Sequence, residues 1–254
     1  MSGHSKWATI KRKKAATDSA RGRLFTRLIK EITIAARNGG GNAEGNPRLR
    51  LAIQTAKAAN MPADNIKRAI QKGTGELPGV AYEEVTYEGY GPGGVAILVD
   101  IVTDNNNRTV SEMRHVFSRN NGNLGTSGSV AWMFQRKGTV TVPRQGQASA
   151  LTEDDMLAII LDAGADDLQT EDEMFTITTS PQAFDAVKKA IEDAGIAVDN
   201  ASLQMIPQNL TRVAGKEAEQ VLKLMEALEE HDDVQNVYAN FDIDEKELAS
   251  LNNG

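Results

Sequence analysis

Three glycines in the stretch YEGYGPGG, residues 87–94, stand at the spacing that a phosphate-binding loop would use. Gly89, Gly91 and Gly94 match G-x-G-x-x-G, which in a dinucleotide-binding fold follows a strand and opens a helix whose N-terminus faces the pyrophosphate. Here the glycines are followed by VAILVDIV, a short β-branched run that is typical of a strand, and no Gly-Lys-Ser/Thr ending follows them. The order strand, glycines, strand therefore favours a hairpin turn, in which Pro92 fixes φ and the glycines are free to take positive φ.

Other residue types that could perform catalysis or bind a metal lack the partners they would need. The chain has no cysteine, which excludes disulfides, thiolate nucleophiles and cysteine-ligated metal sites. Glu112 and His115 could share a helix face as half of a metal site, but the sequence offers no second pair. The GTSGS stretch lacks the G-x-S-x-G pattern of a nucleophile elbow. We therefore predict no enzyme activity, no metal, no cofactor and no small-molecule substrate.

The distribution of charge along the chain is the strongest functional signal. The net charge of the 254 residues is −7, yet residues 1–72 hold 16 Lys or Arg and 4 Asp or Glu, a net charge of +12. Residues 73–254 carry the opposite excess, a net charge of −19. A basic segment on an acidic body indicates an anionic partner, and nucleic acid is favoured over a merely solvated surface. Phosphate contacts of this kind give affinity without sequence selectivity.

The cations expected to contact phosphates lie on a basic arm and on the helix predicted over LFTRLIKEITIAARNGGG. On that helix Arg23, Arg27, Lys30 and Arg37 share the side opposite the apolar face, with Ile34 as an exception. The predicted nucleic-acid-binding residues are Lys6, Lys11, Arg12, Lys13, Lys14, Arg21, Arg23, Arg27, Lys30 and Arg37. A smaller set either touches nucleic acid or belongs to ordinary turns: Arg108, Arg114, Arg119, Asn121 and Asn123.

The elements around these residues predict an α+β protein. Helices begin at Pro47 and Pro62, and Gly39 and Gly73 end helices, within a basic N-terminal part. Strand patterns follow, including one over GSVAWMFQ, and the order from Gly138 onward is β-α-β-β-α-β, which is ferredoxin-like. We expect a helical domain followed by two ferredoxin-like α+β domains, one inserted in the other. Their expected bounds are 1–79, 80–137 plus 208–254, and 138–207.

The sequence also bears on the compartment. The longest uninterrupted apolar run, Val95 to Val99, is far shorter than the ~20 residues of a membrane-spanning helix. The absence of cysteine fits the cytosol, and the basic N-terminus lacks the apolar core of a secretory signal. Nine cations among the first 30 residues leave a mitochondrial transit peptide as the alternative. We predict a cytoplasmic protein without a membrane segment.

Long motifs in a fixed order resemble the YebC family. They are GHSKW, KAA, RGRLFTRLIKEI, GGG and NPRLR near the start, then YEGYGPGG, DNNNRT and NLGTSGSVAWMF. The resemblance spans essentially the whole chain and implies a three-domain cytoplasmic protein with no known catalysis. Because family members of bacterial type begin at the same GHSKW, it also implies that no transit peptide is present. The family is usually described as DNA-binding transcriptional regulators, while similar mitochondrial proteins are translational activators and bacterial members have been connected to stalled ribosomes.

Two functions follow from these observations. We favour a translation factor that contacts ribosomal RNA through its basic N-terminal part. The alternative is a transcriptional regulator that binds double-stranded DNA with the same part, although the sequence shows no helix-turn-helix recognition helix and no dimerising segment. An arm joined to a small helical bundle suits folded RNA at least as well. A nucleotide enzyme would depend on GYGPGG alone.

Overall fold

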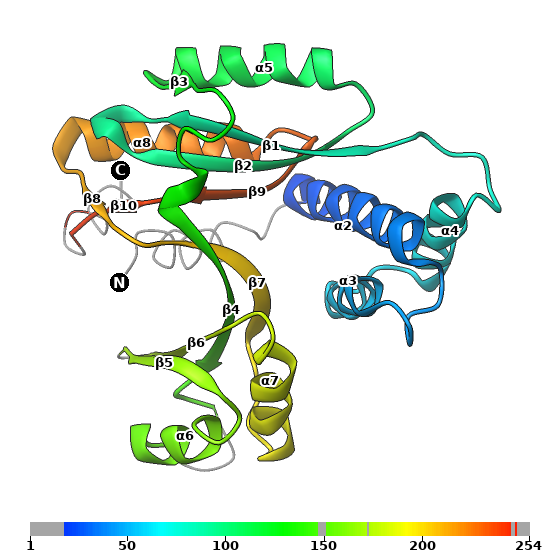
Figure 1. The fold of residues 1–254 in the computed structure, drawn as a ribbon, viewed down its shortest axis with the longest axis vertical. Coiled ribbons are helices and arrows are strands. Elements are labelled where there is room, and N and C mark those ends of the chain that lie inside the picture. The colour runs from blue at the N-terminus through cyan, green and yellow to red at the C-terminus, as the bar shows by residue number, and fades with distance from the viewer. Residues whose placement is uncertain (1–17, 147–150, 172, 245–246, 248–254) are drawn as a thin grey trace. The chain divides into compact units, whose positions relative to one another are not determined.

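The computed structural model describes residues 18–146, 151–171, 173–244 and 247. Of the described residues, those up to 133 and from 209 onward form one compact unit, and those within 134–208 form a second unit that interrupts it in sequence (Figure 1). The chain is thus an α+β protein with a helical N-terminal part and one α+β domain inserted in another, as the sequence predicts. The three predicted domain bounds stay predictions.

Three helices make up the N-terminal part. They are α2 (Asp18–Gly39), α3 (Pro47–Ala58) and α4 (Ala63–Thr74). Leu28 and Ile32 of α2 pack with Leu49 of α3 and Ile66 of α4 in one buried cluster. The helices approach closely because residue 73 has no side chain: an added Cβ there would lie 2.3 Å from the carbonyl oxygen of Thr33.

Asn46 links the end of α2 to the start of α3 through hydrogen bonds. Its side-chain oxygen accepts a hydrogen bond from the Leu49 N–H, and Pro47 occupies the first helical turn, as the sequence predicts. The side-chain amide of Asn46 donates to the carbonyl oxygens of Ala35 and Gly40, at 2.7 and 2.9 Å. One buried side chain therefore bonds to backbone groups that lack a partner within the helix, both at the end of α2 and at the start of α3.

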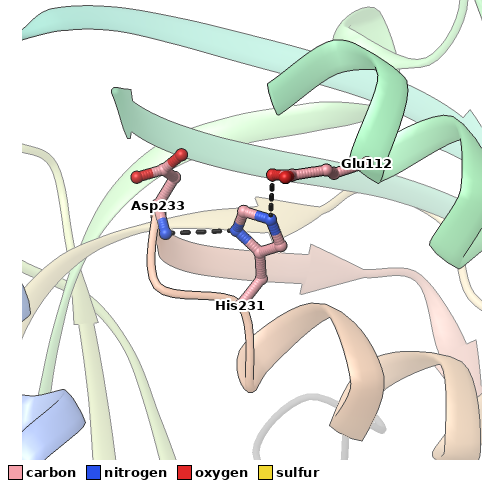
Figure 2. Close-up of side chains that lie close together, drawn as sticks. All are labelled: Glu112, His231 and Asp233. Atoms are coloured by element: carbon pink, nitrogen blue, oxygen red, sulfur yellow. Dashed lines mark hydrogen bonds and ion pairs between the residues drawn. The ribbon is translucent and has the colours of Figure 1, made fainter. Parts of the chain in front are cut away.

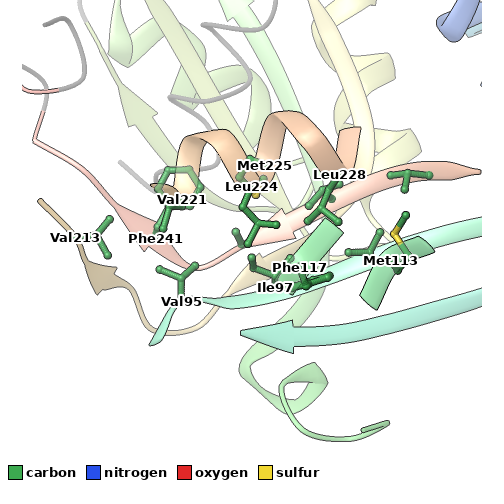
Figure 3. Close-up of a cluster of buried hydrophobic side chains, with 14 of the residues drawn as sticks. Val95, Ile97, Met113, Phe117, Val213, Val221, Leu224, Met225, Leu228 and Phe241 are labelled. Atoms are coloured by element: carbon green, nitrogen blue, oxygen red, sulfur yellow. The ribbon is translucent and has the colours of Figure 1, made fainter. Parts of the chain in front are cut away.

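The α+β part of the first unit is an antiparallel sheet with two helices on one face. Its strands are β1 (Glu83–Tyr90), β2 (Ala96–Thr103), β3 (Asn123–Leu124) and β9 (Val234–Ala239), in the order β3-β1-β2-β9. The helices are α5 (Asn106–Arg119) and α8 (Gly215–Glu229), which contact each other. Figure 3 shows Leu224 and Leu228 of α8 pointing towards Ile97 of β2 and Phe117 of α5 in a shared apolar core. The short strands β8 (Thr211–Arg212) and β10 (Phe241–Asp242) pair beside it.

The glycine-rich stretch between β1 and β2 is a turn, as predicted. The two strands pair antiparallel up to Tyr90 and Ala96, and residues Pro92–Gly94 form a single 3-10 turn between them. Gly93 and Gly94 have φ of 67° and 76°, the left-handed region that disfavours other residues. A strand, not a helix, follows these glycines, so they lack the helix N-terminus that a dinucleotide site requires.

Replacing Gly91 with valine should lower the free energy of unfolding by about 1–3 kcal/mol, because the new side chain would overpack the core. A Cβ at residue 91 would lie 3.1 Å from Ile97 Cδ1 and 3.3 Å from Leu224 Cδ2. Urea unfolding measures the loss, with Gly45→Val as the control, since an added Cβ at residue 45 meets one atom at 4.0 Å. A Gly91→Val protein that is fully stable but fails to bind its partner would contradict a structural role for the turn.

The second unit has the ferredoxin-like order that the sequence predicts. It runs β4 (Phe134–Pro143), α6 (Glu153–Ile160), β5 (Ala165–Thr170), β6 (Met174–Thr179), α7 (Phe184–Asp193) and β7 (Asn200–Pro207). The strands pair antiparallel in the order β5-β6-β4-β7, so each helix connects two strands that are separated by a third. Met156, Phe175 and Val187 lie in the core between helices and sheet.

The structure at the start of the second unit differs from what the sequence predicts. The strand predicted over GSVAWMFQ is wrong for its first six residues, because Ala131–Met133 form a 3-10 turn and β4 begins at Phe134. The same strand continues through Gly138, where the sequence predicts that a new strand begins. The glycine is needed for packing, since an added Cβ would lie 2.3 Å from Thr179 Oγ1 and 2.5 Å from Phe184 Cδ2. None of the helices in the described ranges is both long and apolar enough to span a bilayer.

Candidate nucleic-acid interface

The predicted basic side of α2 faces an acidic segment of the same chain. This acidic turn, residues 229–233, joins the end of α8 to β9. Arg23 Nη2 lies 3.8 Å from Glu230 Oε1, and Arg27 donates a hydrogen bond to the carbonyl oxygen of Glu229. The C-terminal end of a helix carries partial negative charge, so both cations are favourably placed there. Arg23 and Arg27 therefore bond within the chain.

Lys30 is the most deeply buried of these cations. Its residue is only 6% exposed, and its ammonium group has three hydrogen-bond acceptors. Lys30 Nζ donates to the carbonyl oxygens of Val102 and Asp232, at 3.1 and 2.9 Å, and to Asp233 Oδ1 at 2.7 Å. A lysine ammonium has three donors, so all of them are used. In this arrangement Lys30 has no donor left for a phosphate.

The Asp233 carboxylate connects α2 to α5. Its second oxygen accepts hydrogen bonds from Arg108 Nη2 and Thr109 Oγ1, both at 2.8 Å, while the first is bonded to Lys30. Burial alone would raise the pKa of Asp233, but its hydrogen bonds to these three side chains lower that pKa well below the usual range. Asp233 is thus a charged group that ties the helical part to the α+β part of the first unit.

The other predicted cations of α2 are accessible. Arg21 and Arg37 are exposed, so they stay candidates for phosphate contacts. Lys6, Lys11, Arg12, Lys13 and Lys14 lie outside the described residues. Sequence reasoning did not single out five further exposed cations on α3 and α4, although the charge count of the segment includes them: Arg50, Lys57, Lys67, Arg68 and Lys72.

The smaller predicted set, around α5, also contains both a side chain bonded within the chain and exposed side chains. Arg108 belongs to the Asp233 network, whereas Arg114 and Arg119 are exposed on α5. Asn121 is exposed and has φ of 58°, so it forms the left-handed turn after that helix. Asn123 is exposed at the start of β3. The turn alternative therefore holds for Asn121, while nucleic-acid contacts by the exposed side chains stay a prediction.

A buried carboxylate that sequence reasoning missed organises the loop at residues 125–133. Glu88 is 6% exposed, and its two oxygens accept hydrogen bonds from the backbone N–H groups of Gly128, Val130 and Ala131. Burial alone would raise the pKa of Glu88, but the three N–H donors together hold it below its ordinary value. A glutamate on a strand gives no sign in sequence that it will bind a loop some 40 residues later.

Replacing Glu88 with glutamine should lower the free energy of unfolding by about 2–3 kcal/mol, because the new NH2 group cannot accept a hydrogen bond from the backbone N–H that it faces. The stabilisation should be present above the unfolded-state pKa of about 4.3 and be lost as the pH falls below it, since the folded-state pKa is lower. Urea unfolding at neutral and acid pH measures both effects. Glu83→Gln, at an exposed position of the same strand, is the matched control. Equal stability of both variants at neutral pH would contradict this role.

Three side chains that could ligate a metal meet near the end of α8 (Figure 2). His231 Nε2 lies 2.9 Å from Glu112 Oε2, and the Asp233 N–H donates to His231 Nδ1 at 3.1 Å. Because Nδ1 accepts a hydrogen bond, the neutral ring carries its proton on Nε2 and donates it to Glu112. The Nδ1 lone pair is then used by the Asp233 N–H and Nε2 carries the proton, so neither ring nitrogen offers a free lone pair to a metal. Hydrogen bonds explain the cluster, and the partner of Glu112 is His231, not the His115 that the sequence suggests.

Comparison with known proteins identifies the family. A model of the TACO1/YebC protein N-terminal domain matches residues 5–76, and a model of the TACO1/YebC second and third domain matches residues 82–241. The chain belongs to the TACO1/YebC family. The resemblance carried by GHSKW, YEGYGPGG and NLGTSGSVAWMF is thereby confirmed.

Relatives within the TACO1/YebC family match along their whole length. A protein from Chlorobaculum tepidum is 58% identical over 252 residues, and one from Solibacter usitatus is 59% identical over 251 residues. Each alignment covers 99% of this chain and 99% of the relative, and both relatives bear the name probable transcriptional regulatory protein. The crystal structure of a conserved hypothetical protein from Aquifex aeolicus is similar, with a TM-score of 0.81 and 48% identity. That match covers 90% of this chain and 93% of the other.

Proposed function

We propose that this TACO1/YebC-family chain is a non-enzymatic, cytoplasmic regulator of gene expression that binds nucleic acid, and that its target is RNA, in particular ribosomal RNA. The charge separation is the observation that carries the proposal. The first 72 residues carry a net charge of +12 and the remainder −19. A basic segment of this kind attracts a phosphate backbone, while the acidic remainder disfavours indiscriminate binding to polyanions.

The phosphate-binding surface that we propose differs from the sequence-based one. It excludes Arg27 and Lys30, which donate hydrogen bonds to the acidic turn, and it assigns no phosphate contact to Arg23, which lies 3.8 Å from Glu230. It retains the basic arm and the exposed cations of α2, and it adds the exposed cations of α3 and α4. Cations that are spread over several short helices suit the irregular backbone of folded RNA.

Two features favour RNA over double-stranded DNA. A recognition helix in a major groove needs a free polar face, but on α2 Arg27 and Lys30 are hydrogen-bonded within the chain and Arg23 pairs with Glu230. The exposed Trp132 and the exposed asparagines after α5 are groups that suit unpaired bases. The specific reason to keep DNA as the second candidate is the printed name of the relatives, probable transcriptional regulatory protein.

Sedimentation of the native protein from cell lysate through a sucrose gradient tests the proposal. Co-migration with ribosomal particles that survives DNase and is lost after RNase treatment is the expected result. The gradient should be repeated at several salt concentrations, because phosphate contacts weaken steeply with salt. Absence from ribosomal fractions at every salt concentration, together with DNase-sensitive retention on chromosomal DNA, would establish the second candidate instead.

A further inference from the structure

We propose that Tyr90 and Trp132 form a stacking site for an unpaired nucleobase of single-stranded RNA. This inference rests on the proposed function, and it adds a second contact that is separate from the basic N-terminal part. Trp132 is 67% exposed and Tyr90 is 37% exposed, and both are among the large apolar residues that the first unit displays to solvent. An exposed indole is a costly feature that commonly marks an interaction site.

The polar edges of the two rings are held by the same backbone atom. Tyr90 Oη donates to the carbonyl oxygen of Ser129 at 3.0 Å, and Trp132 Nε1 donates to that same oxygen at 3.1 Å. Each side chain therefore has its hydrogen-bonding group turned to the protein while a large part of its surface stays in water. A large exposed aromatic surface whose polar edge is satisfied is suited to stacking, which needs no hydrogen bond to the ring.

The backbone beneath the rings is firmly held. Glu88 accepts three N–H groups of the loop at residues 125–133, and the Glu88 carbonyl oxygen accepts the Gly125 N–H at 2.7 Å. Within the loop, the Met133 N–H donates to the Val130 carbonyl oxygen at 2.9 Å. Aromatic rings on a loop that is already ordered lose little conformational entropy when a ligand stacks on them.

A polar group beside Tyr90 is suited to hydrogen-bonding with the edge of a base. Asn123 of β3 pairs directly with Tyr90 of β1, so their side chains lie on the same face of the sheet. Asn123 is exposed, as are Asn121 and Arg119 just before it in sequence. An amide group such as that of Asn123 hydrogen-bonds to base edges. The side chain next to Tyr90 on the sheet is thus polar, which matches a nucleotide better than a purely apolar ligand.

Fluorescence titration tests the stacking site. The chain has two tryptophans, Trp7 and Trp132, so Trp7→Phe leaves Trp132 as the only indole. In that protein, an oligouridylate of twelve nucleotides should quench the emission of Trp132. Adding Trp132→Ala leaves no indole, so its affinity is measured by gel shift; it should weaken binding of this strand about 5- to 150-fold, the effect of losing one stacked base, and leave binding of a blunt RNA duplex unchanged. Trp132→Phe should restore part of the affinity.

The controls separate this inference from the proposed function. Leu210→Ala removes another exposed apolar side chain of the same unit and should change nothing. An oligothymidylate of equal length shows whether RNA or DNA supplies the base. If oligouridylate binds without quenching and Trp132→Ala has no effect, the stacking site is wrong while RNA binding by the basic part stands. If the parent protein binds no nucleic acid at low salt, the proposed function fails as well.

Discussion

Replacing Asp233 with asparagine is expected to lower the free energy of unfolding by about 3–5 kcal/mol, since it leaves a buried cation without its counterion. The Lys30 ammonium would keep its two backbone acceptors and lose the carboxylate that balances its charge at 2.7 Å. The Asn amide has one acceptor oxygen, so either Lys30 or the pair Arg108 and Thr109 would face its NH2 group instead of an acceptor. Urea unfolding at neutral pH measures the loss, and amide hydrogen exchange in α2 shows whether it includes release of that helix.

The same variant should change how stability depends on pH. Because the pKa of Asp233 in the folded state lies below its unfolded value of about 3.9, the carboxylate contributes its full stabilisation above that value. The contribution is lost as the pH falls towards the folded-state pKa. The parent protein should therefore lose stability more steeply than Asp233→Asn as the solution is acidified below about pH 4.

An exposed ion pair between α2 and the acidic turn provides the control. Glu230 pairs with Arg23 at 3.8 Å, and its side chain is 60% exposed. Exposed pairs contribute about 0–1 kcal/mol, so Glu230→Gln should unfold nearly like the parent. If Asp233→Asn were as stable as Glu230→Gln, the buried network would not hold the helical part to the α+β part of the first unit.

Local patterns in the sequence predict much of this fold. The N-cap at Asn46 followed by Pro47, the hairpin around Pro92, and the strand and helix order after Gly138 all depend on residues within about ten positions of one another. Propensity, capping and turn chemistry act over that range, so the elements they specify appear in the structure. The ferredoxin-like order also limits the strand arrangement, because crossover connections are restricted.

Contacts between distant segments explain what the sequence could not predict. Helical periodicity places Lys30 on the polar side of α2, but its partner Asp233 lies about 200 residues later. Ile34, the exception on that side, is buried, and it was the one sign that the basic side is covered. Glu88 was missed for the same reason, since its partners lie in a loop some 40 residues away.

Replacing Lys11, Arg12, Lys13 and Lys14 with glutamate is expected to abolish nucleic-acid binding at physiological salt. Each lost phosphate contact should reduce the slope of log affinity against log salt by about 0.7 on single strands and about 0.9 on duplexes. Loss of all four contacts would lower the magnitude of that slope by about 3–4. A gel-shift titration over a salt series measures this effect, and far-UV circular dichroism checks that the fold is intact.

The control variant carries the same change in net charge elsewhere. Arg212, Lys189, Lys216 and Lys223 are exposed and lie outside the basic N-terminal part, so reversing them also changes the net charge by −8. If both variants lost affinity equally, net charge alone would govern binding. Unchanged affinity of the arm variant at low salt would instead move the interface to the exposed cations of α3 and α4. Selective loss in the arm variant would locate phosphate binding in the arm, because phosphate contacts are local while the net charge of the two variants is the same.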